Sequence, residues 1–149
     1  MDLTAAQLRT VQLGPLWVLS ALTGTSRFGV DDLRAFWDGL VEIALGLPEP
    51  GRGLLTSMTA DRPGLLSDFA ADERPVVSGL RHVVAVLDQL EPPAGQQVKT
   101  AMLRIGIAVG RARGPYGRQL TFEDNQRLLL VAQLLEVDAA PTVGAELLV

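Results

Sequence analysis

The chain contains no cysteine and only one histidine. The lack of cysteine excludes disulfides, thiolate catalysis and cysteine-ligated zinc or iron–sulfur sites. The histidine, His82, lies off the apolar face of its predicted helix, so we expect it to face solvent. One histidine without cysteine makes neither a typical zinc site nor a promising catalytic triad, and no G-x-S-x-G motif is present. These absences argue against an enzyme, although a small enzyme with an unrecognised site stays open as an alternative.

Aromatic residues and long apolar runs are also scarce. Seven residues are aromatic, and three of them (Trp17, Phe36, Trp37) belong to the predicted core, which leaves few for a sugar-binding cleft. No apolar run approaches the roughly 20 residues that a membrane span requires, and no signal peptide is visible. The net charge of −4 makes the chain a poor general binder of nucleic acid or anionic membrane. We expect a cytoplasmic protein that binds neither.

The composition and the apolar pattern indicate a globular helical protein. The chain has 149 residues, of which 48% are hydrophobic and 20% charged, and this suffices for one domain with a sizeable core. Helical periodicity dominates and strand alternation is almost absent. Every loop is too short to link independent cores. The sequence therefore predicts an all-α, single-domain bundle of about six to seven helices that spans residues 1–149.

Five helices are predicted from apolar residues that recur every three or four positions. Pro15 is expected to interrupt the first helix. Asp72 and Thr121 are expected to cap the third and the fifth. Gly106 and Gly110 in the fourth lack side chains and favour close helix packing. The predicted ranges are 5–22, 30–47, 73–90, 94–111 and from 121 onward, with one or two short helices within 52–72 and a short terminal helix from Pro141.

One pattern occurs twice along the chain. Residues 16–47 and residues 103–137 each read as an apolar helix, a glycine-bearing polar loop, a short acidic segment and a second apolar helix. Residues 30–32 of the first copy align with residues 122–124 of the second. A repeat of this size predicts two related helical hairpins with pseudo-twofold symmetry.

The acidic pairs at equivalent places in the two copies are a candidate metal site. They are Asp31 and Asp32 in the first copy, and Glu123 and Asp124 in the second. Carboxylates gathered at one end of a bundle suit a divalent cation such as calcium or magnesium. The alternative is that they cap helix N-termini and favour the helix dipole. The loops before them contain no acid, unlike a D-x-D-x-D-G calcium loop, so capping is favoured.

The second loop is a candidate anion site. Arg111, Arg113 and Arg118 surround a glycine-bearing turn, and such arginines can hold a phosphate or carboxylate. The turn follows a helix rather than a strand and lacks G-K-[ST], which excludes a phosphate-binding loop. A solvated surface turn is the alternative.

The repeated pattern resembles the TerB-like tellurite-resistance family, which includes the N-terminal helical domains of some membrane-anchored DnaJ-like co-chaperones. Residues 13–40 and 98–137 look like the family's two halves. The resemblance implies an all-helical bundle of about seven helices and a stress- or tellurite-resistance-related process. The family carries Ala-Asp-Gly before each acidic segment, whereas Thr23 and Arg113 replace the aspartate here, and Asp32 and Asp124 stand in place of the family's glutamates. The acidic loop motif of the family is therefore absent.

Protein interaction is the function that these observations favour. A divalent-metal or anion sensor is the first alternative, and no resident cofactor is expected otherwise. The apolar C-terminal residues Leu147, Leu148 and Val149, together with the irregular segment 54–69, are candidates for a homodimer contact.

Overall fold

The described part of the chain, residues 3–114 and 119–138 of a computed structural model, is helical and contains no strand. This confirms the all-α prediction. Within these residues no helix is long and apolar enough to cross a bilayer. The elements in order are α1 (Ala5–Thr23), α2 (Val30–Leu45), α3 (Gly51–Thr56), the 3-10 helix η1 (Ser57–Asp61), α4 (Arg62–Ala71), α5 (Val76–Leu87), α6 (Ala94–Arg113) and α7 (Phe122–Leu135).

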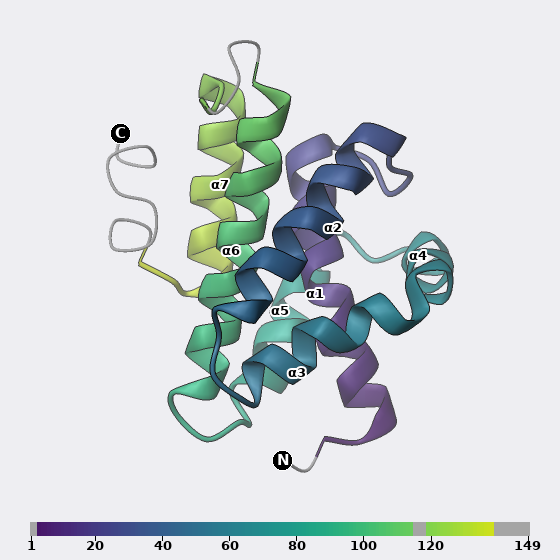
Figure 1. Cartoon of the computed structure of the whole chain (residues 1–149), viewed down its shortest axis with the longest axis vertical. Helices are drawn as coiled ribbons and strands as arrows, with labels where there is room; N and C mark the ends of the chain where they lie inside the picture. The colour runs from purple at the N-terminus through teal and green to yellow at the C-terminus, as the bar shows by residue number, and fades with distance from the viewer. Residues whose placement is uncertain (1–2, 115–118, 139–149) are drawn as a thin grey trace.

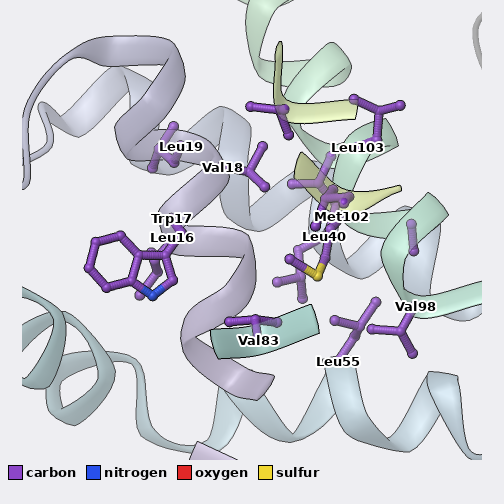
Figure 2. Close-up of a cluster of buried hydrophobic side chains, with 14 of the residues drawn as sticks. Leu16, Trp17, Val18, Leu19, Leu40, Leu55, Val83, Val98, Met102 and Leu103 are labelled. Carbon is purple, nitrogen blue, oxygen red and sulfur yellow. The ribbon is translucent and has the colours of Figure 1, made fainter. Parts of the chain in front are cut away.

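Helix α1 lies in the centre of the bundle (Figure 1), because its second half is apolar on all sides. It packs chiefly against α5 and also against α6 and α7, while α2 packs chiefly against α6. Figure 2 shows side chains from five helices meeting in the core that results. Burial of each large side chain there contributes roughly 1.5–3 kcal/mol to folding. The labelled residues include Leu16, Val18, Leu40, Leu55, Val83, Val98 and Met102, all buried.

The predicted interruption of the first helix is wrong, because α1 continues through Pro15. Proline removes one helical N–H and crowds the carbonyl four residues earlier. The neighbouring Gly14 lies against two other helices, and a Cβ there would come within 2.8 Å of Met102 Cε and 3.0 Å of Val83 Cγ1. Close packing of α5 and α6 against this turn offsets the local cost of the proline.

The irregular segment is helical almost throughout, as α3, η1 and α4 in direct succession. The predicted N-cap role of Asp72 is wrong, because α5 begins after Pro75 and Asp72 instead ends α4. The Asp72 carboxylate accepts hydrogen bonds from the Arg74 side chain, the shortest at 2.6 Å, and from the Arg74 backbone N–H. These bonds and the charge of Arg74 lower the pKa of Asp72, and the same side-chain hydrogen bond raises the pKa of Arg74.

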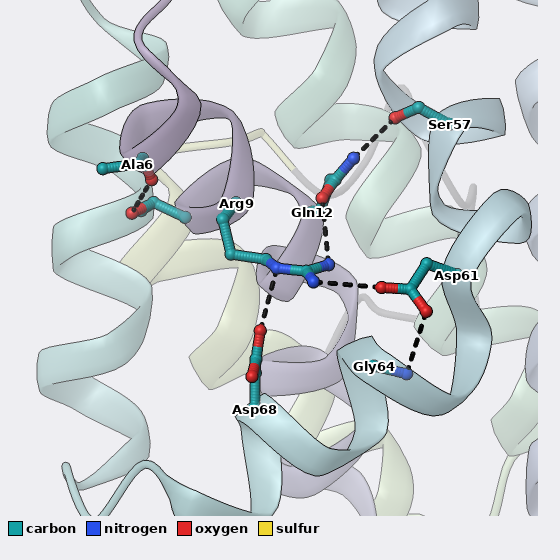
Figure 3. Close-up of polar contacts among 8 residues, drawn as sticks. Ala6, Arg9, Gln12, Ser57, Asp61, Gly64 and Asp68 are labelled. Atoms are coloured by element: carbon teal, nitrogen blue, oxygen red, sulfur yellow. Dashed lines mark hydrogen bonds and ion pairs between the residues drawn. The ribbon is translucent and has the colours of Figure 1, made fainter.

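A polar network centred on Arg9 joins α1 to η1 and α4 (Figure 3). Arg9 Nε lies 2.9 Å from Asp68 Oδ2, and Arg9 Nη2 lies 3.2 Å from Asp61 Oδ2. Gln12 accepts a hydrogen bond from Arg9 and donates one of 2.9 Å to Ser57 Oγ. Exposed pairs of this kind contribute little stability individually. The network's main effect is to orient α4 over α1.

The two copies of the sequence repeat differ in their packing. Helices α6 and α7 contact each other, whereas α1 and α2 have their main contacts with α5 and α6 respectively. Gly106 lies where α6 meets its neighbours, since a Cβ there would come within 2.7 Å of Val18 Cγ1 and 2.8 Å of Leu128 Cδ2. The close packing expected at Gly106 is thus confirmed, while the pseudo-twofold symmetry stays a prediction. The terminal helix from Pro141 and the dimer contact at 147–149 lie outside the described residues.

Candidate functional site

The four predicted acids lie at the upper end of the bundle in Figure 1, where α2 and α7 begin. Asp31 and Glu123 are exposed, Asp32 is half-buried, and Asp124 is buried. In the described parts of the chain, no group of three or more acidic or histidine side chains is placed to share a metal ion. The structure therefore brings the acids to one end without assembling them into a ligand set.

Two of these acids each lie beside an arginine. Arg113 Nε is 3.7 Å from Asp32 Oδ1, and Arg127 Nη1 is 3.5 Å from Asp124 Oδ1. Both arginines also donate hydrogen bonds to the Leu22 carbonyl near the end of α1, at 3.2 Å and 3.0 Å. The last carbonyls of a helix lack helical partners and favour cations. We call these residues (Leu22, Asp32, Arg113, Asp124 and Arg127) the arginine cluster. Its two guanidinium groups offset the negative charges of Asp32 and Asp124.

Capping is observed at one of the two acidic segments. Thr121 Oγ1 accepts a 3.1 Å hydrogen bond from the Asp124 backbone N–H, as predicted for α7. The Asp124 carboxylate pairs with Arg127 and has no bond to the cap residue in the described contacts. Helix α2 begins after Gly29 with no side-chain cap, so Asp31 and Asp32 can favour its N-terminus only through their charge.

The candidate anion-binding arginines have separate surroundings. Arg113 belongs to the arginine cluster, and Arg111 is half-buried on α6 and also has an interaction partner. Arg118 lies outside the described residues. The exposed His82 is on α5, away from both candidate sites, as expected for a solvent-facing histidine. The anion site stays a prediction.

Sequence reasoning missed a cleft of about 890 Å³ at the opposite, lower end of the bundle. The loop between α2 and α3 and the loop between α5 and α6 form its walls, and the start of α1 borders it. Its volume is typical of ligand-binding pockets. We call it the proline cleft, after four of its lining residues: Pro48, Pro50, Pro92 and Pro93.

The two loops of the proline cleft are similar in sequence, and this similarity is the signal that could have revealed the site. One loop reads LPEPG over residues 47–51 and the other LEPPAG over residues 90–95. Each supplies one glutamate, and each ends in a proline at the N-cap of the next helix. A Cβ at Gly51 would lie 3.5 Å from Val98 Cγ2, and one at Gly95 would overlap the Leu87 carbonyl. A side chain at position 51 would thus make only ordinary contacts, whereas the lack of one at Gly95 lets the start of α6 pack against the end of α5.

The carboxylates of the proline cleft differ from those of the arginine cluster, because neither forms an ion pair within the described residues. Glu49 Oε2 accepts a 3.2 Å hydrogen bond from the Gly53 backbone N–H. The Glu91 side chain is exposed and makes no hydrogen bond in the described structure. The described lining residues carry amide, carboxylate and apolar groups, and none of them is a histidine, serine or threonine. Its chemistry is therefore suited to binding through hydrogen-bond acceptors and rigid apolar walls.

No protein-family model, curated protein or solved structure matches this chain. The TerB-like resemblance therefore stays a sequence prediction, and function has to be inferred from the geometry of the two ends.

Proposed function

We propose that the protein is a non-enzymatic helical domain that acts by binding another protein, with the proline cleft as its docking surface. The observation that carries the proposal is a concave surface of about 890 Å³ between two similar proline loops, with carboxylates that have no ionic partner in the described structure. Proline fixes the backbone of both walls, so little conformational entropy is lost when a partner binds.

The arginine cluster favours this role over that of a metal sensor. Guanidinium groups already lie beside Asp32 and Asp124, so a cation bound there would have to displace them. The TerB-like motifs suggest a stress- or tellurite-resistance-related process in the cytoplasm. That part of the proposal rests on sequence resemblance alone.

Site-specific photocrosslinking in cells tests the docking surface. A photoreactive amino acid in place of Gln97, which lines the cleft, is compared with the same group in place of the exposed Gln133 on α7. We expect protein adducts from position 97 that position 133 does not give. Equal adducts from both positions, or none from position 97, would overturn the proposal.

A further inference from the structure

We infer that the proline cleft binds a linear protein segment carrying two basic side chains, one for Glu49 and one for Glu91. The inference rests on the proposed function and specifies the chemistry of the partner.

The two carboxylates of the cleft have no ion-pair partner among the described residues. Of the described residues, two with carboxylates and none with a cationic side chain line the cleft. The nearby cations in the sequence form no ion pair with either acid in the described structure: Lys99 Nζ lies 2.6 Å from Asp88 Oδ1, and Arg52 Nε donates to the Leu47 carbonyl of the same loop as Glu49 at 3.0 Å. Lys99 is also buried. A positively charged partner therefore meets two acids that need not give up an internal ion pair.

The remaining walls suit the stems of lysine and arginine. These side chains have long methylene stems that pack on apolar surface while the charged head reaches a polar group. The four prolines, together with Leu3 and Leu90, supply the apolar surface beside the two carboxylates. A guanidinium can bind a carboxylate through two parallel hydrogen bonds. A bare divalent cation fits less well, because among the described residues no third acidic or histidine side chain is placed to share a metal ion with these two.

The similarity of the two loops indicates two basic residues rather than one. Each loop has one glutamate followed directly by a proline, Glu49 before Pro50 and Glu91 before Pro92, so the two halves of the cleft offer similar chemistry. A volume of about 890 Å³ is large enough for several side chains of a short linear segment.

Fluorescence anisotropy with synthetic peptides tests the inference. The probes are labelled heptapeptides of alanine and leucine with two arginines separated by one to four residues. Matched peptides replace one or both arginines with glutamine. We expect at least one two-arginine peptide to bind, the one-arginine peptides to bind more weakly, and the uncharged peptides not to bind. Binding should weaken as salt rises.

Two double variants of equal charge locate the binding. Glu49→Gln/Glu91→Gln removes the cleft acids, and its glutamine at position 49 can still accept the Gly53 N–H bond. Glu73→Gln/Glu123→Gln removes two exposed acids outside the cleft. We expect the first variant to weaken binding about tenfold or more, because two charge-assisted contacts are lost. The second should bind like the wild type.

The outcomes separate this inference from the proposed function. If no two-arginine peptide binds, or if both double variants lose affinity equally, the charge-based inference is overturned. Cleft-specific adducts at position 97 that persist in Glu49→Gln/Glu91→Gln would overturn it too, while the docking function would stand. If position 97 gives no cleft-specific adducts, both the docking function and the charge-based inference are overturned.

Discussion

The carboxylates at the two ends of the bundle differ in whether they have an ionic partner in the described structure. At the upper end, Asp32 and Asp124 each lie beside an arginine, and both arginines also bind the same α1 carbonyl. At the lower end, Glu49 and Glu91 line a cleft to which the described residues contribute no cationic side chain. A carboxylate with an internal ionic partner contributes to the fold, whereas one held in a concave surface without such a partner is available to a ligand.

The largest expected effect comes from reversing the charges of the arginine cluster. Arg113→Glu/Arg127→Glu would place two new acids beside Asp32 and the buried Asp124. We expect the free energy of unfolding to fall by roughly 3 kcal/mol, because a buried carboxylate loses its partner. Urea denaturation followed by circular dichroism measures the change.

A matched variant separates the cluster from net charge. Arg81→Glu/Arg104→Glu makes the same change in total charge at two exposed positions on α5 and α6. Its loss should be about 1 kcal/mol or less in total. Equal losses in the two variants would mean that overall charge, and not the cluster, stabilises the upper end.

Removing a helix cap at each end should change the free energy of unfolding by smaller amounts. Thr121→Ala removes the hydrogen bond that caps α7 at the upper end and should cost about 1 kcal/mol. Thr4→Ala removes the cap of α1 near the lower end, where the first turn is exposed and can fray. We expect a smaller loss there, measurable by thermal unfolding. A larger loss from Thr4→Ala would show that the lower end is the more tightly ordered one.

The local pair between Asp72 and Arg74 should add a modest pH dependence. Because Arg74 lowers the pKa of Asp72 in the folded state, the pair stabilises the fold above the ordinary aspartate pKa of about 3.9. This contribution is lost as the pH falls through the lowered value. Arg74→Gln should therefore reduce stability by about 0.5 kcal/mol at pH 7, since solvent screens the partly exposed arginine. The two curves should converge once the pH lies below the lowered pKa of Asp72, and a constant gap would contradict the pairing.

The smallest effect is expected at the cleft. Glu49→Gln/Glu91→Gln should change the free energy of unfolding by no more than about 0.5 kcal/mol, because neither acid has an ionic partner in the described structure. Urea denaturation provides the measurement. A loss comparable with that of the cluster variant would show that both ends use their acids for folding.

The helices could be predicted from the sequence because their apolar periodicity is a local signal. Local rules failed at Pro15, where α1 continues because distant helices pack against it. They also failed at Asp72, whose side chain accepts hydrogen bonds from Arg74 and does not cap a helix. The cap at Thr121 depends on neighbours three residues apart and was predicted correctly.

The sites were harder to predict because their partners lie far apart in the chain. The hydrogen bond from Arg127 to the Leu22 carbonyl spans 105 residues, and no local sequence pattern around either residue predicts it. The proline cleft likewise arises only when α3 and α6 pack together and bring two similar loops to one end. The acids of the upper end were identified from the sequence, but the pairing of Asp32 with Arg113 and of Asp124 with Arg127 was not predicted.

The ion pair between Lys99 and Asp88 has a practical consequence. Lys99 is the only lysine, and its side chain is 5% exposed. Acylating reagents that target lysine amines will therefore react slowly at this position in the native protein. The acylation rate becomes a single-site kinetic probe of how often the α5–α6 contact opens. Coupling the protein to a biosensor surface through its lysine would select opened molecules, so tethering through another chemistry is preferable.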